Sequence, residues 1–357
     1  MVQKKSPTAI VTGVTGQDGF YLAHYLLSLG YRVVGIDRRT SLPTDQRLRT
    51  LRGSPNFFML NGDVTDISSI EHVMNTFNPD EFYHLAAQSH VGLSWQSPIS
   101  TVDITGVGTL NCLEAIRKSA PKCKFYFAGS SEQFGNSICE RTYAEVDPRN
   151  RHVPLNEKST MDPESPYAAA KVFGYNITHV YQRSYNMFAS CGILFNHESP
   201  MRGEQFVTRK ITLGLANIAA GNQKQLKLGN LDACRDWGFA GDYVKAMHAM
   251  LQIDNPDDFV IATGETHSVR EFLEIACDYF GIPGPNESDQ VISDPNLFRP
   301  KDVNVLLGDA SKAKKLLDWE PEVSFEKLVQ MMCEHDKHYV SGRMDLADTH
   351  LGVTHVQ

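Results

Sequence analysis

The side chains best suited to chemistry lie between residues 129 and 171. Ser130 and Glu132 follow a hydrophobic run that predicts a strand, and Tyr167 and Lys171 come later, four residues apart. On a helix such a pair lies on one face, so the lysine ammonium would stabilise a phenolate and lower the pKa of Tyr167. The spacing predicts a tyrosine base that takes a proton from a sugar hydroxyl near neutral pH. Ser130 would share the hydrogen bond of that hydroxyl, and Glu132 adds a second, separate base.

Many helices contain a tyrosine and a lysine four residues apart, so this interpretation depends on a nucleotide site earlier in the chain. Residues 8–12 predict a strand, residues 13–19 a glycine turn, and residues 31–36 a second strand, with an apolar helix between the turn and the second strand. This order is that of a dinucleotide-binding βαβ unit, in which glycines let the backbone approach a pyrophosphate at the helix N-terminus. The glycines of the turn, spaced Gly-x-x-Gly-x-x-Gly, are Gly13, Gly16 and Gly19.

The end of the second predicted strand carries conflicting signals about which dinucleotide binds. Asp37 is the kind of residue that holds the ribose hydroxyls of NAD. Arg38 and Arg39 are the kind that accept the 2′-phosphate of NADP. We predict NADP as the cofactor, and Asp37 leaves NAD open as the alternative.

The alternation of strands and helices predicts the fold class. Further strands are expected at residues 57–60, 82–86, 124–128 and 189–195, with helical segments between them. Such alternation is typical of an α/β protein with a Rossmann-type, doubly wound parallel sheet, which binds its ligands at the carboxyl edge of the strands. The fifth strand, at residues 124–128, would deliver Ser130 and Glu132 to that edge.

The pattern becomes looser after residue 200, so we expect three parts. Residues 1–200 would form the dinucleotide-binding domain with the catalytic residues, residues 201–340 a smaller mixed α/β substrate lobe with interleaved elements, and residues 341–357 a loose C-terminal tail. Cations of the second part, among them Lys210 and Arg235, would hold a diphosphate.

The composition excludes several classes of protein. The 357 residues carry a net charge of −8 and contain no Lys/Arg-rich run, which argues against a nucleic-acid partner. No apolar run approaches the length of a membrane span, and the first residues lack the hydrophobic region of a signal peptide. Seven scattered cysteines without a Cys-x-x-Cys pair predict reduced thiols in a cytoplasmic protein, with no metal site and no disulfide framework.

Longer motifs resemble a known family. TGVTGQDG at residues 12–19 and AAQSHVG at residues 86–92 resemble the extended short-chain dehydrogenases. More specific segments resemble the GDP-mannose 4,6-dehydratase family, namely NHESPMRGE at 196–204, FVTRKI at 206–211, LGNLDA at 228–233, RDWG at 235–238 and FRP at 298–300. The resemblance covers roughly residues 8–335, and the motifs occur in the order of the family.

The resemblance implies a role for each matching residue. The catalytic residues would be Ser130, Glu132, Tyr167 and Lys171. Contacts to the nicotinamide cofactor would come from Gly13, Thr15, Gly16, Gln17, Asp18, Gly19, Asp37, Arg38, Arg39, Asp63, Val64, Leu85, Ala86, Ser89, Tyr167, Lys171, His197 and Arg202. Contacts to the nucleotide sugar would come from Gln88, Ser94, Asn196, Val207, Lys210, Arg235, Arg299 and Asp302.

The resemblance also gives each of the two bases a step. Tyr167 would take the proton from the sugar O4 while the C4 hydride passes to the cofactor. Glu132 would then remove the C5 proton, made acidic by the 4-keto group, as water leaves from C6 and the hydride returns to C6. The expected activity is that of a lyase, which converts GDP-mannose into GDP-4-keto-6-deoxymannose.

Three alternatives stay open at this point. The first is a 4,6-dehydratase of another GDP-sugar, such as GDP-manno-heptose. The second is a nucleotide-sugar 4-epimerase or reductase, against which Glu132 counts, because those reactions need the tyrosine and lysine but no carboxylate two residues after the serine. The third is a binding or redox-sensing protein with the same fold, which would have no need of two bases.

The chain departs from the family pattern at several positions. Ser130 stands where the family usually has threonine, which keeps the hydroxyl, whereas Phe134 and Ser100 stand where it usually has tyrosine. The interval between Glu132 and Tyr167 is longer than in the family, and residues 138–158 would roof the hexose pocket, which leaves the identity of the sugar open. Relatives are commonly homodimers or homotetramers, so we expect one of these assemblies.

Overall fold

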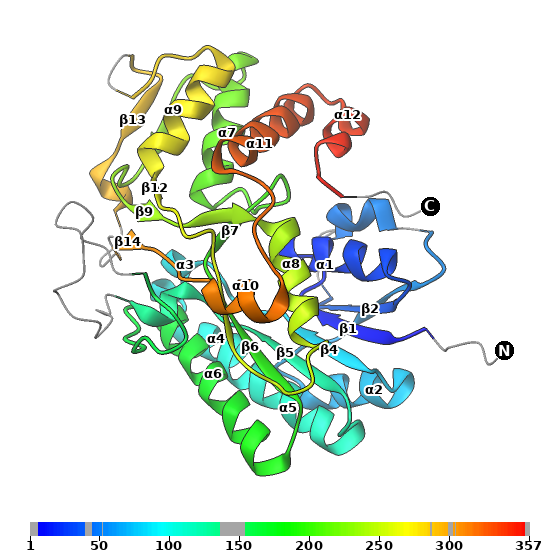
Figure 1. Ribbon diagram of the computed structural model, residues 1–357. Coiled ribbons are helices and arrows are strands. Elements are labelled where there is room, and N and C mark those ends of the chain that lie inside the picture. Colours follow the sequence, from blue (N-terminus) through cyan, green and yellow to red (C-terminus); the bar gives the residue numbers. More distant parts are fainter. Residues whose placement is uncertain are drawn as a thin grey trace.

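A seven-stranded parallel sheet forms the centre of the molecule (Figure 1). The structure is a computed structural model that describes residues 6–39, 45–51, 53–135, 154–285, 288–298, 303 and 305–353. The strand order is β11-β6-β5-β4-β1-β2-β3, and neighbouring strands run parallel. The direction of winding reverses between β1 and β4, so this is the doubly wound Rossmann sheet that the sequence predicts.

The strands of this sheet are short, and most of them are buried on both faces, as parallel strands covered by helices must be. They are β1 Thr8–Thr12, β2 Arg32–Asp37, β3 Phe57–Asn61, β4 Glu81–His84, β5 Lys124–Ala128, β6 Ala189–Leu194 and β11 Phe259–Ile261. The edge strand β11 comes from beyond residue 200, so the second half of the chain completes the sheet of the first half.

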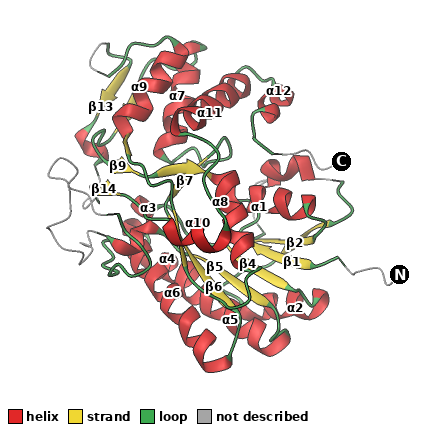
Figure 2. Ribbon diagram, viewed as in Figure 1, coloured by secondary structure: helices red, strands yellow, loops and turns green. Residues whose placement is uncertain are grey.

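Helices cover both faces of the sheet (Figure 2). One face carries α2 Ile67–Phe77, α5 Gly108–Ser119 and α6 Pro166–Tyr185, and the other carries α1 Gln17–Ser28 and α8 Ala240–Met250. Successive residues of a strand point to opposite faces, so Ile10 and Val11 belong to two different apolar clusters.

A smaller lobe stands over the carboxyl ends of the strands (Figure 1). Its helices α7 Val207–Ala219, α9 Val269–Phe280 and α11 Phe325–Val340 pack on one another. Its strands pair in three small sheets, which are β7 Asn196–Glu198 with β10 Trp237–Phe239, β8 Leu226–Leu228 with β13 Val291–Ser293, and β9 Cys234–Arg235 between β12 His267–Ser268 and β14 Val305–Leu306. The remaining elements are η1 Asp45–Leu51, α3 Val91–Gln96, α4 Pro98–Val102, η2 Asp103–Val107, η3 Ser131–Phe134, η4 Pro295–Leu297, α10 Ser311–Leu317 and α12 Met344–Thr349.

The fourth strand ends earlier than the sequence predicts. It stops at His84 instead of residue 86, because the backbone N–H groups of Leu85 and Ala86 donate to the side chain of Thr12, at 3.1 and 3.2 Å. These two residues therefore leave the strand ladder and turn toward the glycine-rich segment.

The expectation of a loose tail after residue 340 is wrong for the part of it that the structure describes. Helix α12 packs against α11, and Asp348 pairs with Arg49. The buried hydroxyl of Tyr21 donates to the backbone carbonyl of Leu351 at 2.8 Å. The sequence does not predict this docking, because the contacts join the end of the chain to α1 and η1, which lie near its beginning.

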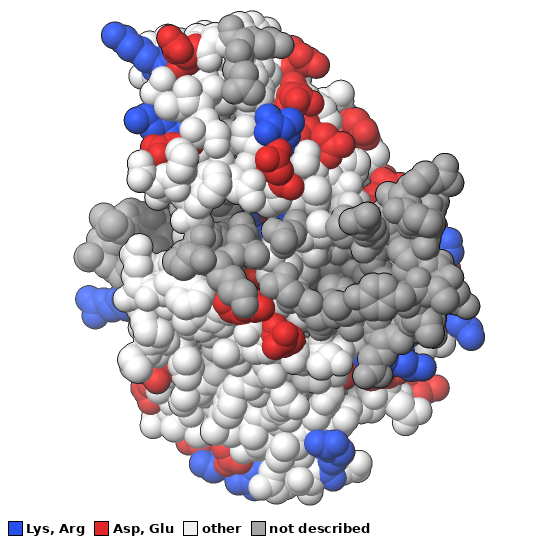
Figure 3. Space-filling model, turned by 90° about the vertical axis from the view of Figure 1, so that its left-hand side faces the viewer, with Lys and Arg blue, Asp and Glu red and all other residues white. Residues whose placement is uncertain are grey.

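The described surface carries charges of both signs. On the face drawn in Figure 3, acidic and basic side chains are scattered among uncharged ones, and the described residues of that face show no continuous basic patch. Within the described part of the chain, we find no helix with the length and apolar character needed to cross a bilayer.

Candidate active site

A cleft lies between the carboxyl edge of the sheet and the second lobe. Its volume is about 810 Å³. The residues that follow β1, β2, β4, β5 and β6 line one side, and residues of α7, β8, β9 and β10 line the other. The sheet edge is where an open α/β sheet binds its ligands.

The glycine turn has the shape that a dinucleotide pyrophosphate needs. Gly13 has a positive φ of 69°, and a Cβ on it would meet the backbone N and Cα of Ala86 at 3.0 Å. Gly16 caps α1 without a side-chain hydrogen bond, so no side chain of the cap occupies the first N–H groups of the helix. The turn therefore offers backbone donors and open space to an anion, and these residues fit a nicotinamide dinucleotide.

The end of β2 presents both a carboxylate and cations to the cleft. Asp37 Oδ2 accepts a hydrogen bond from Thr15 Oγ1 at 2.9 Å, and Asp37 Oδ1 accepts one from the backbone N–H of Arg38 at 2.9 Å. Arg47, from η1, lies beside them and donates to the carbonyl of Thr15 at 3.1 Å. The structure thus keeps the conflict between NAD and NADP signals that the sequence carries.

The turn after β5 fixes Ser130 and Glu132. Ser130 is the N-cap of η3, and its Oγ accepts from the backbone N–H of Glu132 at 3.3 Å. The side chain of Gln133 accepts from the backbone N–H of Ser130 at 2.7 Å, which closes the capping box. The cap holds both residues in the cleft lining, with Glu132 partly exposed to it.

Helix α6 presents Tyr167 and Lys171. It begins at Pro166, which has no N–H to satisfy, and Ser165 caps it by accepting from the N–H of Ala168 at 3.1 Å. Both Tyr167 and Lys171 are buried and line the cleft, and a hydrogen bond joins the side chains of Tyr167 and Ser130. The predicted group of four catalytic side chains therefore meets at one place.

Burial works against the lowering of the Tyr167 pKa that the Lys171 ammonium is predicted to cause. Burial raises the pKa of Tyr167 to about 12, although the hydrogen bond with Ser130 opposes that rise. The Lys171 ammonium donates to the carbonyl of Ala128 at 2.6 Å and lies 5.8 Å from the centre of the Tyr167 ring. Burial lowers the pKa of Lys171 to about 8. Further positive charge in the cleft is needed before Tyr167 ionises near neutral pH.

An ion pair joins Asp18 of α1 to His197 of β7. His197 Nε2 lies 2.9 Å from Asp18 Oδ2, and His197 Nδ1 lies 2.7 Å from the carbonyl of Phe195. Burial opposes the charge of Asp18, but the charge of His197 and hydrogen bonds from His197 and Gln17 lower the pKa of Asp18 to about 2. The pair keeps the start of α1 against the second lobe at the middle of the cleft.

The opposite wall carries groups suited to a polar ligand. Arg202 pairs with the buried Glu198 at 3.0 Å and stacks on the ring of Phe206 at 3.7 Å. Asn196 lines the cleft, and its buried Oδ1 has no hydrogen-bond partner among the described residues. Lys210 also lines this wall. Such a wall can hold phosphate and hydroxyl groups of a nucleotide sugar.

The structure places the predicted site residues as follows. Those that line the cleft are Gly13, Thr15, Gly16, Gln17, Asp18, Gly19, Asp37, Arg38, Val64, Leu85, Ala86, Gln88, Ser89, Ser130, Glu132, Tyr167, Lys171, Asn196, His197, Arg202, Val207, Lys210 and Arg235. Arg39, Asp63 and Ser94 do not line it, and Ser94 is buried with its hydroxyl on the carbonyl of Val91. Arg299, Asp302 and residues 138–153 of the expected insertion lie outside the described residues.

Sequence reasoning did not assign Arg47, Glu198 and Phe206 to the site, although all three line the cleft. Arg47 gave no signal, because it reaches the glycine turn only through the folding of η1. Glu198 lies in the motif NHESPMRGE, directly after His197, and Phe206 begins the motif FVTRKI, four residues after Arg202. Their nearness in the sequence to these two predicted site residues was the available signal.

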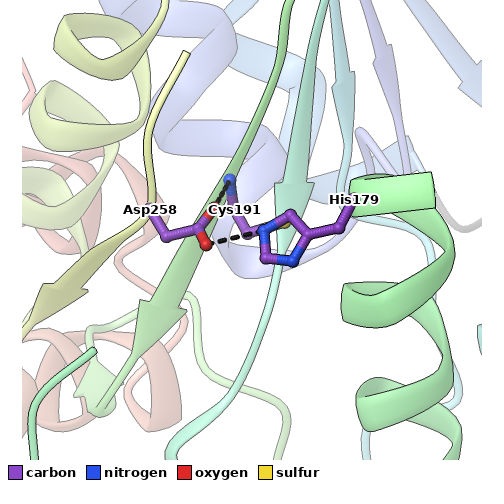
Figure 4. A group of neighbouring side chains, drawn as sticks. All are labelled: His179, Cys191 and Asp258. Atoms are coloured by element: carbon purple, nitrogen blue, oxygen red, sulfur yellow. Dashed lines mark hydrogen bonds and ion pairs between the residues drawn. The ribbon is translucent and has the colours of Figure 1, made fainter. Parts of the chain in front are cut away.

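A hydrogen-bonded cluster ties the helix of Tyr167 to the sheet (Figure 4). Asp258 accepts from the hydroxyl of Tyr175 at 2.8 Å, lies 2.7 Å from His179 Nε2, and accepts from the backbone N–H of Cys191 at 3.2 Å. Tyr175 and His179 continue the four-residue spacing of Tyr167 and Lys171, so all four share one face of α6.

This cluster contains metal-ligand side chains, but its chemistry favours a hydrogen-bonded clamp. The Asp258 carboxylate already accepts from its three neighbours, and burial raises the pKa of the Cys191 thiol well above its ordinary value. A thiol must ionise to bind zinc. We therefore interpret Asp258 as the anchor that holds α6 on the sheet.

Replacing Asp258 with asparagine is expected to lower the free energy of unfolding by about 3 kcal/mol at neutral pH. The amide has only one oxygen to accept hydrogen bonds, so some of the groups that donate to Asp258 would face the amide NH2 instead. Burial alone would raise the pKa of Asp258, but the hydrogen bond and charge of His179 lower it. The stabilisation is therefore present above the ordinary carboxyl pKa and is lost as the pH falls through the folded-state value. Urea unfolding of both proteins between neutral and acidic pH would measure the difference in their free energies of unfolding, and this difference should become smaller in acid.

The neighbouring Asp257 supplies the control. It is half-exposed and pairs with Lys312 at 2.7 Å, so Asp257→Asn should cost less than about 1 kcal/mol. Equal effects of the two substitutions would contradict the anchor role of Asp258.

Comparison with known proteins identifies relatives along nearly the whole chain. The family model described as GDP-mannose 4,6 dehydratase matches residues 10–332. GDP-mannose 4,6 dehydratase 1 of Arabidopsis thaliana is 45% identical over 97% of this chain and 94% of its own length. GDP-mannose 4,6-dehydratase of Vibrio cholerae is 46% identical over 92% of this chain and 93% of its own length. The resemblance predicted from the motifs is confirmed.

Solved structures with the same fold are more distant in sequence. UDP-glucose 4-epimerase of Thermotoga maritima, solved with UDP-glucose, has a TM-score of 0.79 at 23% identity and covers 93% of this chain and 99% of its own. dTDP-glucose 4,6-dehydratase of Bacillus anthracis, in complex with NAD, has a TM-score of 0.77 at 21% identity and covers 92% and 96%. RMD of Pseudomonas aeruginosa, complexed with NADPH, has a TM-score of 0.75 at 20% identity and covers 94% and 100%. These neighbours share the Rossmann-type fold and include complexes with either nicotinamide dinucleotide.

Proposed function

This chain belongs to the GDP-mannose 4,6-dehydratase family, and from that premise we propose that it converts GDP-mannose into GDP-4-keto-6-deoxymannose. The observation that carries the proposal is the meeting of two different bases, Tyr167 and Glu132, at one point of the cleft. A reaction that only moved a hydride at C4 would need the first base and not the second.

The roles of the catalytic side chains follow from their places. A bound nicotinamide cofactor supplies a positively charged hydride acceptor at the start of the reaction and a hydride donor at its end. Positive charge near the buried phenol favours its ionisation, so Tyr167 takes the O4 proton with Ser130 sharing the hydrogen bond. Glu132 takes the C5 proton and returns it to the hydroxyl that leaves C6 as water, and C5 then receives the proton held by Tyr167 as the hydride returns to C6. Lys171 adds a cation on the same face of α6.

The second lobe would hold the GDP part of the substrate. Helix α7 begins at Val207 in the cleft lining, and its N-terminus favours a phosphate. Lys210 and Arg235 add cations to the same wall, and the unpartnered Asn196 Oδ1 offers an acceptor to a hydroxyl or N–H group. Arg235 is buried, so a phosphate paired with it would be shielded from solvent.

The direct test is mass spectrometry of GDP-mannose after incubation with the purified protein and no added reductant. Loss of one water without net reduction of cofactor is the expected result. Tight binding of GDP-mannose without turnover would point to a different GDP-sugar, such as a GDP-heptose. Neither binding nor turnover would overturn the proposed nucleotide specificity.

We propose NADP as the cofactor, with Arg38 and Arg47 near its 2′-phosphate. Asp37 is the observation that favours NAD, because a carboxylate at this place repels a phosphate and can hold ribose hydroxyls. Asp37→Asn is expected to shift the ratio of NADP to NAD affinity about tenfold toward NADP. Arg38→Ala should shift it in the opposite direction, and titration calorimetry with both dinucleotides measures both ratios. A ratio unchanged by either substitution would contradict this account.

We also propose that the protein forms a homodimer or homotetramer through the side of the sheet covered by α4 and α6. Apolar side chains there are exposed, among them Ile99 at 75% and Phe173 at 44%. Figure 3 shows mostly uncharged side chains in the middle of its lower half, on the side where Figure 1 draws these helices, and charged side chains along the lower margin. A patch of this kind marks a protein interface. A variant with Ile99→Glu and Phe173→Glu should fall to the monomer mass of 39.9 kDa in light scattering, and an unchanged multimer would contradict this surface.

A further inference from the structure

A buried polar chain lies directly beneath the glycine turn. Thr12, at the end of β1, uses its Oγ1 to accept from the backbone N–H groups of Leu85 and Ala86, at 3.1 and 3.2 Å. Ala86 is also the residue whose backbone lies 3.0 Å from the place where a Cβ of Gly13 would stand. The Thr12 hydroxyl therefore fixes the segment that forms the floor of the dinucleotide site.

The proton of that hydroxyl can go to one neighbour. Thr12 Oγ1 lies 3.0 Å from Nδ1 of His84, the residue paired with it on β4. A hydroxyl that accepts two N–H donors must direct its own hydrogen elsewhere, so Thr12 donates to His84 Nδ1. The Cys112 thiol lies 3.7 Å from the same nitrogen, and burial raises its pKa, so it places no negative charge beside the ring.

The other end of the imidazole fixes the same tautomer. His84 Nε2 lies 3.1 Å from Thr109 Oγ1, and Thr109 donates its hydrogen to the carbonyl of Thr105 at 2.7 Å. Thr109 must therefore accept from His84, which makes Nε2 the protonated nitrogen and Nδ1 the acceptor. Burial lowers the pKa of His84 to about 3, so the ring stays neutral.

The ring is buried beside aromatic side chains. It is 2% exposed and stacks against Phe125 and Phe127, with centroids 6.1 and 6.3 Å away. His84 does not line the cleft, so it does not touch a ligand there.

We propose that His84 is a positioning residue for the nicotinamide dinucleotide. His84 accepts a hydrogen bond from the Thr12 hydroxyl, which leaves the lone pairs of Thr12 Oγ1 to the N–H groups of Leu85 and Ala86. In this way His84 sets the distance between that segment and Gly13. The proposal rests on the dinucleotide site described above. It goes beyond that site, because it says that a residue outside the cleft holds the Leu85–Ala86 segment in its place.

Two substitutions separate this role from a merely structural one. In His84→Asn, the amide oxygen falls near the place of Nδ1 and can still accept from Thr12, while the bond to Thr109 is lost. In His84→Gln, the amide reaches the place of Nε2 and keeps the bond to Thr109, while Thr12 loses its acceptor. Each variant loses one buried hydrogen bond, so both should lower the melting temperature by a similar amount.

The measurement is titration calorimetry of the full chain, freed of bound dinucleotide, with NADPH and NADH, and with GDP as the reference ligand. We expect His84→Gln to weaken dinucleotide binding about tenfold or more, and His84→Asn to stay within about threefold of wild type. GDP affinity should stay at the wild-type value in both. Thr109→Val, which removes only the hydrogen-bond partner of His84 Nε2, should behave like His84→Asn. It replaces His84→Asn if that variant does not fold. If His84→Gln does not fold, Thr12→Val replaces it and should show the same tenfold loss.

Equal dinucleotide affinities of the two His84 variants would overturn the positioning role while leaving the dinucleotide site intact. Wild-type protein that binds neither dinucleotide would overturn the role together with the cofactor site on which it depends. A parallel loss of GDP affinity would show that the substitutions disturb the whole cleft, and would also overturn the proposal.

Discussion

Replacing Glu132 with glutamine is expected to reduce water elimination from GDP-mannose by about three orders of magnitude, because the variant keeps the shape of the side chain and loses the base. Ser130 and Tyr167 remain in place, so oxidation at C4 should still occur. Reduced dinucleotide should therefore accumulate on the enzyme, visible by its ultraviolet absorbance, together with a 4-keto sugar that has lost no water. Calorimetry should give the wild-type affinity for GDP-mannose within about threefold.

The control for this variant is Glu204→Gln, which removes the same charge from an exposed residue outside the cleft lining. It should turn over at the wild-type rate. Normal water loss by Glu132→Gln would refute the scheme with two bases, and loss of activity by both variants would assign the effect to net charge.

Replacing Tyr167 with phenylalanine should stop the reaction at an earlier step. The phenol is the group placed to take the O4 proton, so we expect a loss of about 10²- to 10⁴-fold in turnover with neither reduced dinucleotide nor keto sugar appearing. The ring is buried and phenylalanine fills the same space, so the free energy of unfolding should change by only about 1 kcal/mol. The same absorbance and mass measurements distinguish this block from the one expected for Glu132→Gln.

A tyrosine at the end of the same helix gives the matched control. Tyr185 is 51% exposed and far from the cleft lining, so Tyr185→Phe should leave turnover unchanged. Accumulation of reduced dinucleotide in Tyr167→Phe would show that another group takes the O4 proton.

The phenol of Tyr167 needs bound ligands as well as Lys171 to act as a base. Burial holds that pKa at about 12 in the chain by itself, so the phenol ionises near neutral pH only if bound ligands bring positive charge to it. The sequence predicted that the Lys171 ammonium would lower this pKa. The structure instead gives the Lys171 ammonium a carbonyl partner, Ala128, on the neighbouring strand.

Local features of the sequence determined much of this protein. The glycine turn between β1 and α1 and the four-residue spacing of Tyr167 and Lys171 on α6 act over a few residues, so spacing alone predicts them. The alternation of strands and helices likewise predicts a doubly wound sheet, because parallel strands need a helical crossover. The resemblance to the family predicted four catalytic side chains, Ser130, Glu132, Tyr167 and Lys171, and the structure places all four in the lining of one cleft.

Only the tertiary structure decided how those side chains are held and charged. Asp258 anchors α6 through Tyr175, 83 positions away in the chain, and His84 reaches Thr12 across 72 positions. Burial, which sets the pKa of Tyr167, depends on the packing of the whole domain. Hydrogen bonds of this range leave no periodic trace in a sequence, and a desolvation energy belongs to an environment that exists only after folding. The same reason hid the docking of α12 at the end of the chain, where contacts with α11 and η1 replace the expected loose tail.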